Sequence, residues 1–383
     1  MNESIIAEKP FIYTADDYFD FIKKYAHKKY SFVSYVLEKN THPFISNIKT
    51  KAVVVTVQND AWLVTVNNKE YDNAITCSPY TVYIGYPKEI AKKFSGFWMK
   101  GLIYVFPRLF SVVFKSLKIN KVVQVNNNLI SFSNYSPFFC NNFESLLNVL
   151  VNSYQRHAIL FPHVNEVIDH KLTESLRKFG FILIQNRATH LYDPASKYMN
   201  RTDVKKDLDL LKKSKYTVIR HEELTTADLD RIFELYQQLF IKKHTYYNPN
   251  FTKEYFYYSH KYRWNEYIAL RNTEGIIDAY TAWCVQNNVM MATGCGYDLD
   301  QPRELGLYRM ANVLGLQHAD ENNYLYNLGG GSDQFKLNRG SKKVTEYLAV
   351  YCDHLPFFRR IPWNVLAWCG EKILPSLYRV NML

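Results

Sequence analysis

The sequence predicts an α/β (α+β) fold of two tandem domains, each a mostly antiparallel mixed sheet flanked by helices. The chain has 383 residues, about twice the size of a common domain. Hydrophobic residues make up 47% of it and charged residues 22%, a balance typical of chains that bury a core. Short runs rich in Val, Tyr, Phe and Thr alternate with amphipathic helical runs in both halves. These observations together indicate a repeated α/β unit.

Strands in the first half are expected where β-branched and aromatic residues gather. These runs are residues 31–37, 51–57, 61–66, 80–84, 158–161 and 181–184. Two helices are expected, over residues 14–29, which start at a Thr cap, and over residues 167–179, which end at Gly180. Residues 58–60 suit a hairpin turn. The first half is therefore predicted to mix strands with helices.

The second half repeats this order in outline. Amphipathic helices are expected over residues 226–243, 254–265 and 306–321. The strands are expected at residues 267–270, 276–285, 289–297, 324–328 and 345–351, the first three forming a meander. A run of three glycines follows the fourth of these strands, and residues 333–339 are predicted to be irregular.

A change of composition marks the expected domain boundary. Residues 197–220 hold eight Lys or Arg against three Asp, so we place the boundary near residue 190. The predicted parts are a degenerate first domain (1–190), a second domain with the active centre (191–353) and an aromatic, basic C-terminal segment (354–383). The basic stretch suits a solvated helix face, or a surface that grips phosphates or an acidic carrier protein.

Charge and cysteine usage limit the classes of function. Lys and Arg total 47 against 36 Asp and Glu, and the net charge of +11 favours an acidic partner: a phosphorylated cofactor, a nucleic acid, an acidic carrier protein or an anionic membrane. The six cysteines lack metal-binding spacing, so neither a structural metal site nor a disulfide scaffold is expected. We expect a cytoplasmic protein, with peripheral membrane contact through residues 354–383 as one option.

The region after residue 300 carries a resemblance to a known family. Leu305-Gly-Leu-Tyr308 opens a helix, Tyr326-Asn-Leu-Gly-Gly-Gly-Ser-Asp-Gln-Phe-Lys336 follows it, and Arg339-Gly340 comes next. This order resembles the C-terminal half of the FemAB-like acyltransferases, which belong to the GNAT superfamily of N-acyltransferases. The basic residues 201–215 and the corner at residues 176–181 are similar to other parts of such domains. The resemblance covers residues 190–350 and the first half in outline, and it implies two tandem GNAT-like domains.

The resemblance also implies a reaction and its residues. An acyl group would pass from a thioester to an amine, with Lys336 stabilising the oxyanion. Asp333 would deprotonate or orient the amine, and Tyr308 would protonate the leaving thiolate. Arg303 and Gly306 match part of the acetyl-CoA signature, although Tyr308 stands where the family has a small residue.

The expected donor site is completed by Tyr297 and the glycine run Gly329, Gly330 and Gly331. Missing side chains there would let a ligand approach the sheet closely. The resemblance implies no permanently bound cofactor: acyl-CoA or an acyl carrier protein is the co-substrate, and the acceptor is a small-molecule amine from a biosynthetic pathway.

Two other functions fit the same residues. One is an aminoacyl-tRNA-dependent transferase, as FemAB relatives are, although the sequence shows no inserted helical hairpin like the FemAB coiled-coil arm. The other is an inactive GNAT-like binding module, favoured by the altered pyrophosphate loop. The C-terminal segment has two interpretations as well, since it suits packing on the first domain, with the apolar residues 102–114, or docking on an anionic bilayer.

Overall fold

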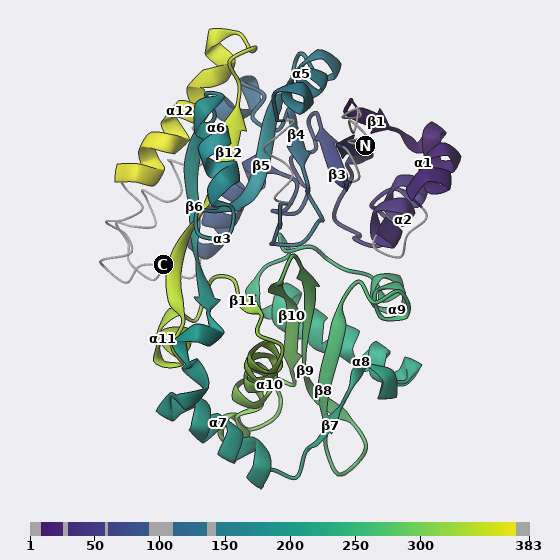
Figure 1. Cartoon of the computed structure of the whole chain (residues 1–383), viewed down its shortest axis with the longest axis vertical. Helices are drawn as coiled ribbons and strands as arrows, with labels where there is room; N and C mark the ends of the chain where they lie inside the picture. Colours follow the sequence, from purple (N-terminus) through teal and green to yellow (C-terminus); the bar gives the residue numbers. More distant parts are fainter. Residues whose placement is uncertain (1–8, 26–29, 58–59, 92–109, 136–142, 373–383) are drawn as a thin grey trace, which may run out of the picture.

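The computed structural model describes residues 9–25, 30–57, 60–91, 110–135 and 143–372. Twelve strands of this part form one sheet, in the order β1-β2-β3-β4-β5-β12-β6-β11-β10-β9-β8-β7 (Figure 1). The predicted turn residues 58 and 59, the apolar residues 102–109 and the last eleven residues lie outside the described part.

The strands and helices alternate along the chain. The strands are β1 (Phe11–Tyr13), β2 (Lys51–Val57), β3 (Asp60–Asn67), β4 (Val122–Val125), β5 (Ala158–Asn165), β6 (Ile182–Tyr192), β7 (Thr217–Ile219), β8 (Glu266–Arg271), β9 (Ile277–Gln286), β10 (Val289–Tyr297), β11 (Leu325–Asn327) and β12 (Lys342–Tyr351). The main helices are α1 (Tyr18–Tyr25), α2 (Ser31–Lys39), α3 (Tyr86–Ala91), α5 (Phe143–Ser153), α6 (His170–Lys178), α7 (Thr202–Lys213), α8 (Thr226–Tyr236), α9 (Lys253–Lys261), α10 (Leu307–Glu321), α11 (Asp333–Asn338) and α12 (Phe357–Lys372).

The two halves repeat one order of elements. In the first half β1, α1 and α2 precede the meander β2–β3–β4, and α5, β5, α6 and β6 follow. In the second half β7, α8 and α9 precede the meander β8–β9–β10, and α10, β11, α11 and β12 follow. The first half has an insertion between β3 and β4, which carries the π-helix η3 (Thr81–Gly85) and α3. The predicted α/β architecture of two mostly antiparallel, helix-flanked halves is therefore confirmed.

Each half contains one short parallel strand pair. Among the described strands, only β4–β5 and β10–β11 run parallel, and each pair is joined over three residues. Val289–Met291 of β10 lie opposite Leu325–Asn327 of β11, whereas β10 continues beyond them to Tyr297. The sheet therefore opens at the same position in both halves, because the two strands separate after a short pairing.

The last strand of each half pairs with the other half. β12 lies between β5 and β6 and pairs antiparallel with both, while β6 also pairs with β11. Residue 190, near which the sequence placed the domain boundary, lies inside β6. The exchange joins the halves through continuous backbone hydrogen bonds instead of a flexible linker.

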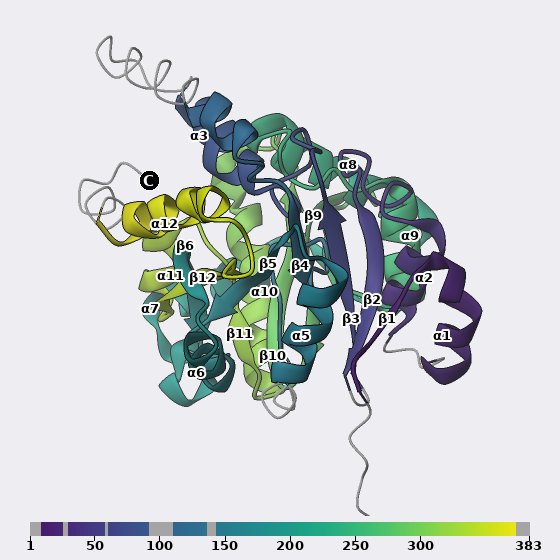
Figure 2. The same cartoon turned by 90° about the horizontal axis from the view of Figure 1, so that it is seen from above.

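Aromatic packing joins the halves a second time, at the other side of the molecule. Tyr35 of α2 lies 4.9 Å from Tyr258 of α9 between ring centroids, and its hydroxyl is 2.8 Å from that of Tyr262. Phe32 lies 5.0 Å from Trp264. Figure 2 shows α1 and α2 beside α9, with α12 on the opposite side. One hydrophobic core accordingly includes residues from both halves.

Three local predictions are wrong. Residues 31–37 are the helix α2, not a strand, and it buries Val33, Val36 and Leu37 at helical spacing. Residues 80–84 are helical as well, since Ser78 Oγ accepts the Thr81 N–H at the helix start. Residues 333–338 form the helix α11 instead of an irregular loop. In the first two segments tertiary burial or a cap outweighs the β preference of the side chains, and in the third the burial of Lys336 accompanies a helix that the local pattern did not indicate.

The described part of the C-terminal segment packs on the sheet of the first half. Trp363 of α12 is 1% exposed and belongs to a core with Phe114, Ile184 and Val350. No described helix combines the length and the apolar character that crossing a membrane requires.

We predict that Trp363→Ala will lower the free energy of unfolding by about 3–5 kcal/mol, because it leaves a cavity under α12. Trp368, on the same helix but 57% exposed, provides the matched control, and Trp368→Ala should change stability by less than about 0.5 kcal/mol. Urea unfolding followed by circular dichroism measures both. Equal effects of the two substitutions would contradict the observed packing of α12.

Candidate functional site

Lys336 is buried and fixed on the glycine run. It lies on α11 and is 3% exposed, and its Nζ donates to the carbonyl oxygens of Leu328 (3.0 Å), Gly329 (3.1 Å) and Gly330 (2.7 Å). Three carbonyls match the three N–H groups of an ammonium. Lys336 therefore shapes the loop that follows β11 and brings a positive charge to the point where β10 and β11 separate.

The conformation of the loop requires glycine. Gly329 and Gly331 have φ of +68° and +76°, values that favour glycine. A Cβ on Gly329 would also lie 2.9 Å from the ring of Phe132. The loop is tied to β6 because the N–H of His190 donates to the Gly329 carbonyl (3.1 Å).

Burial lowers the pKa of Lys336 to about 8, and the nearby Arg187 acts in the same direction. A lysine with this pKa changes its charge close to neutral pH, unlike an exposed lysine. Perturbed lysines of this kind gather at functional sites. Lys336 is therefore the described lysine best suited to a chemical role near the predicted centre.

Asp333, at the start of α11, has two basic partners. Its Oδ1 lies 3.0 Å from His190 Nε2, and its Oδ2 accepts a hydrogen bond from Lys343. These partners hold the pKa of Asp333 below its usual value, against the effect of burial. Burial lowers the pKa of His190, whose Nδ1 lies 2.8 Å from Ser341 Oγ. The carboxylate is thus a weak base that is well placed to orient its neighbours.

Three aromatic rings connect the end of β10 with α11. The centroids of Tyr297 and Tyr308 are 5.8 Å apart, and those of Tyr308 and Phe335 are 4.9 Å apart. Burial raises the pKa of Tyr308 to about 12, so its hydroxyl keeps its proton at neutral pH. Lys243 Nζ donates to the Tyr297 hydroxyl (3.1 Å). The structure therefore brings Tyr297 and Tyr308 next to the helix that carries Lys336.

The other two expected donor residues lie at the start of α10. Arg303 is exposed, in a short turn before that helix. Gly306 is its N-cap, with φ of +66°, and a Cβ there would approach Leu210 of α7 to 2.6 Å. The glycine is explained by this close packing. No contact joins Arg303 to Lys336 or to the glycine run.

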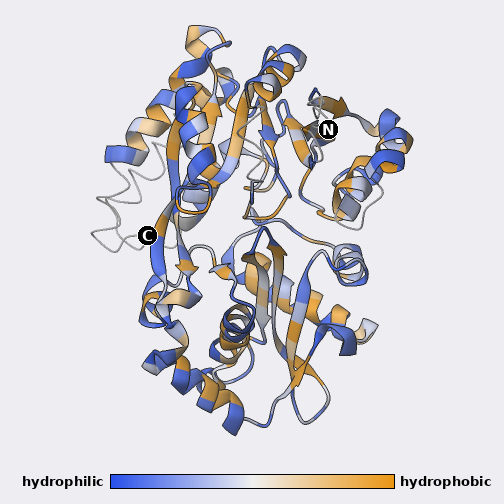
Figure 3. Cartoon of the chain, in the orientation of Figure 1, coloured by the Kyte–Doolittle hydropathy of each residue, from blue (hydrophilic) through white to orange (hydrophobic). Residues whose placement is uncertain are grey.

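The basic helix α7 is amphipathic (Figure 3). Its Lys205 and Lys206 are exposed, whereas Asp207 is 1% exposed. The two oxygens of Asp207 accept from Arg309 Nε and Arg339 Nε, at 2.6 Å each. This buried carboxylate holds α7 against α10 and α11, and leaves the lysines in solvent.

A large cavity lies between the halves, beside the expected site. Its volume is about 770 Å³, within the range of small-molecule sites. Aromatic side chains line it: Tyr30, Phe32, Trp62, Phe132, Tyr255, Tyr262, Trp264, Tyr267, Trp283 and Tyr324. Charged and polar groups among them include Arg220, Arg263, Asp60, Glu222 and Glu266, with Asn126, Asn128, Asn265 and Gln286. Trp283 Nε1 is buried without a hydrogen-bond partner in the described structure. None of the residues predicted as catalytic or donor-binding lines this cavity, whereas Arg220, the last residue of the basic stretch 197–220, does.

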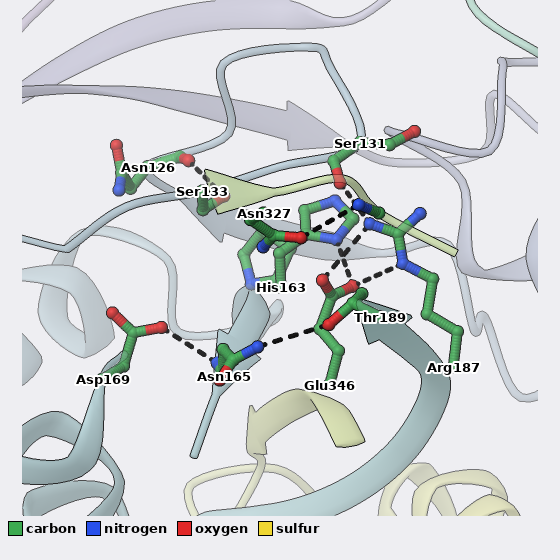
Figure 4. A network of polar contacts seen from close by, with 12 residues as sticks. Asn126, Ser131, Ser133, His163, Asn165, Asp169, Arg187, Thr189, Asn327 and Glu346 are labelled. Atoms are coloured by element: carbon green, nitrogen blue, oxygen red, sulfur yellow. Dashed lines mark hydrogen bonds and ion pairs between the residues drawn. The ribbon is translucent and has the colours of Figure 1, made fainter. Parts of the chain in front are cut away.

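A buried ionic network lies where β5, β12 and β6 meet (Figure 4). Glu346 of β12 is 1% exposed, and its Oε1 accepts from Arg187 Nε (2.8 Å) and lies 2.8 Å from His163 Nδ1. Its Oε2 accepts from Arg187 Nη2 (3.2 Å). Arg187 and His163 lower the pKa of Glu346 to about 2 although the carboxyl is fully buried.

His163 reaches Glu346 because of a β-bulge. The register of β5 and β12 shifts between Tyr347 and Ala349, and His163 has φ of +59°. A non-glycine residue rarely adopts this conformation, and such strain is found at functional positions. The sequence analysis did not predict this network. The feature that could have indicated it is Glu346, an acidic residue within a strand of mostly apolar residues.

Arg187 connects the network with both the cavity and the glycine loop. Its guanidinium lies 5.6 Å from the ring centroid of Phe132, which lines the cavity. It also donates to the carbonyl of Ser131. Phe132 packs in turn against Gly329. A ligand in the cavity would therefore be separated from the loop by this aromatic ring.

The described residues contain no group of three His, Cys, Asp or Glu side chains arranged to hold a metal ion. Near the β10–β11 opening, the groups that could act chemically include the ammonium of Lys336, the hydroxyl of Tyr308 and the carboxylate of Asp333.

Sequence comparison finds no matching family model and no matching curated protein. Solved structures show likeness in fold. FemX aligns over 92% of this chain and 100% of its own, with 10% identity and a TM-score of 0.51. A tandem GNAT protein from the clavulanic acid biosynthesis pathway covers 91% of this chain and 99% of its own, with 10% identity and a TM-score of 0.40. L-PGS from Bacillus licheniformis covers 61% and 80%, with 13% identity and a TM-score of 0.46.

The likeness to FemX extends over both halves and concerns the fold alone, because so few residues are identical. It supports the tandem GNAT-like fold that the sequence resemblance implies.

Asp169 gives a test of the polar layer around Glu346. Burial raises the pKa of Asp169 to about 7, whereas the unfolded chain ionises it near 3.8. The unfolded state therefore loses this proton first, and the contribution of Asp169 to stability falls as the pH rises from 3.8 to about 7. We predict that Asp169→Asn will be more stable than the parent at pH 8, by up to about 4 kcal/mol, and that this difference will nearly disappear at pH 4. Urea titrations at both pH values measure it.

The control is Asp300→Asn, which removes a carboxylate from an exposed loop. Its stability should stay within about 0.5 kcal/mol of the parent at both pH values. An Asp169→Asn difference that does not vary with pH would show that Asp169 is not a buried, titrating carboxyl.

Proposed function

We propose that this chain is an N-acyltransferase that moves an acyl group from a thioester, either an acyl-CoA or an acyl carrier protein, to the amine of a small molecule. The observation that carries the proposal is the buried ammonium of Lys336, fixed on the glycine loop where β10 and β11 separate. Tyr308 lies on the adjoining helix with a protonated hydroxyl. Positive charge and a proton donor are what a tetrahedral acyl-transfer intermediate requires.

The reaction forms a C–N bond and breaks the C–S bond of the thioester. When the neutral amine attacks the carbonyl carbon, negative charge develops on the carbonyl oxygen. Lys336 stabilises that charge electrostatically, and its hydrogen bond to Gly330 is the one it exchanges for the oxyanion, because Gly330 lies at the exposed side of the loop. The departing thiolate takes a proton from Tyr308, the attacking amine loses one to solvent, and Tyr308 regains its proton from solvent.

Asp333 has an orienting role in this proposal. Its lowered pKa makes it a poor proton acceptor near neutral pH, and its two oxygens are occupied by His190 and Lys343. It fixes the first turn of α11 against β6 and β12. This arrangement keeps Lys336 under the glycine loop.

The cavity between the halves is a second space, because the ring of Phe132 lies between it and the glycine loop. Its volume of about 770 Å³ exceeds what a simple amine needs, and its aromatic walls suit a ligand with flat or apolar groups. Arg263 is paired there with Glu222 and Glu266, which line the same cavity. Such a ligand would lie against Phe132, opposite the glycine loop.

The class of donor is tested by thermal shift with coenzyme A, acyl-CoAs, acyl carrier protein and aminoacyl-tRNA. Stabilisation by acyl-CoA or acyl carrier protein, together with release of free thiol in the presence of amines, is the expected result. Stabilisation by aminoacyl-tRNA alone would favour the aminoacyl-tRNA-dependent transferase. Binding without any turnover would indicate a binding module.

We predict that Lys336→Ala will lower the acyl-transfer rate by about 10²–10³-fold, the usual cost of losing one oxyanion-stabilising group. Lys51→Ala, which removes an exposed lysine from β2, should leave the rate unchanged. Rates are measured by thiol release, and circular dichroism verifies that both variants fold. A folded Lys336→Ala protein with the parent rate would assign Lys336 a structural role only.

The dependence of kcat/KM on pH tests whether the charge of Lys336, and not only its shape, contributes to the reaction. Since the pKa of Lys336 is lowered to about 8, the ammonium is lost as the pH rises through that value, and kcat/KM should fall above about pH 8. Lys336→Arg keeps its charge, so its remaining activity should lack this fall. The same fall in both proteins would mean that another group titrates.

A further inference from the structure

The outer face of α12 carries a stripe of exposed apolar side chains. Phe357, Ile361 and Trp368 are four and seven residues apart, a spacing that places them on one side of a helix, and they are 78%, 38% and 57% exposed. Phe358 beside them is 52% exposed. The opposite side of the helix buries Trp363 and Leu366 (Figure 3 gives the hydropathy of α12). One face of α12 is therefore used for packing, and the other is free in the described structure.

The helix is held firmly with this stripe outward. Arg359 is 7% exposed and donates to the carbonyl oxygens of Lys118 (3.2 Å) and Arg156 (3.4 Å). Gly370 lies so close to Gln185 of β6 that a Cβ would come within 3.3 Å of its carbonyl oxygen. These contacts at both ends fix the rotation of α12, so the apolar stripe is a preformed surface.

A second exposed apolar element belongs to the same region. Residues 110–116 are helical, and their Phe114 packs in one core with Trp363. On that helix Val112 and Val113 are 70% and 47% exposed. Exposed apolar side chains concentrated on neighbouring helices mark an interaction surface more often than scattered single residues do.

The charge beside the start of α12 is basic. Lys118 and Arg156, whose backbone oxygens accept from Arg359, are exposed, and so is Lys115. The acidic Asp353 nearby is paired with Arg360 (3.5 Å), and at the other end of the helix Glu371 and Lys372 are both exposed. The net charge of the chain is +11. A surface that joins exposed aromatic side chains to lysine and arginine complements the negative headgroups and the acyl boundary of an anionic membrane.

We propose that the outer face of α12, with Val112 and Val113, docks this protein on the surface of an anionic phospholipid bilayer. The contact is peripheral: Phe357, Ile361 and Trp368 enter the interface between headgroups and acyl chains, while the basic residues meet lipid phosphates. The proposal is independent of the acyl-transfer chemistry, since none of these residues belongs to the Lys336 site.

Vesicle sedimentation of the full chain tests the proposal. Vesicles of phosphatidylcholine with about a third phosphatidylglycerol should pellet the protein at low salt, and pure phosphatidylcholine vesicles should pellet at least tenfold less. High salt should weaken binding to the anionic vesicles. The triple variant Phe357→Ser/Ile361→Ser/Trp368→Ser should lose at least tenfold in partitioning.

The matched control is Phe19→Ser. Phe19 is 77% exposed on α1, at the other side of the molecule from α12 (Figure 2), and its replacement should leave partitioning unchanged. If the triple variant unfolds, Arg156→Glu offers a second readout, a decrease in binding to anionic vesicles at low salt. Failure of the parent to pellet, equal pelleting with neutral lipid, or full binding by a folded triple variant would overturn the proposal. A parent dimer that the triple variant abolishes, with no pelleting, would assign the surface to a second copy of the chain and also overturn it.

Discussion

The structure depends on the place of β12 between β5 and β6. This strand forms nine residue pairs with β6 and five with β5, and it lies at the centre of the twelve-stranded sheet. Glu346 lies on it, and Lys343 on it holds Asp333. β6 pairs with β12 along most of its length and with β11 near its end, and the glycine loop follows β11. The position of the glycine loop therefore also depends on the pairing of β6 with β12. Both polar centres of the molecule are therefore positioned by one strand.

The structure buries two opposite charges, one near each of the short parallel strand pairs. In the second half the charge beyond the parallel pair β10–β11 is the ammonium of Lys336, balanced by backbone carbonyls. In the first half the charge beyond β4–β5 is the carboxylate of Glu346, balanced by Arg187 and His163. An unpaired buried charge is costly in either case. The two buried ions therefore stand on different elements, α11 and β12, and each is balanced by its own partners.

Local sequence patterns predicted the elements of this fold that depend mainly on interactions between residues close together in the chain. The alternation and turns of β8, β9 and β10 were sufficient to predict the meander. The pattern failed at α2, where the spacing of Val33, Val36 and Leu37 favoured a helix and their residue types favoured a strand. Lys336 was found through a short resemblance, but its three carbonyl partners depend on tertiary structure. The exchange of β6 with β12 could not be predicted from a short stretch of sequence, because the two strands are far apart in the chain. The same holds for the pairing of Glu346 with Arg187.

The strand exchange also determines when the first half can be completed during synthesis. β5 ends at Asn165 and β12 begins at Lys342, so a ribosome that adds about 5–20 residues per second exposes the partner edges of β5 and β6 for on the order of ten seconds before β12 emerges. Unpaired strand edges invite pairing with other chains. The nascent first half therefore presents two unpaired strand edges until β12 inserts between them. Completion of the sheet is a late step in the synthesis of the described chain.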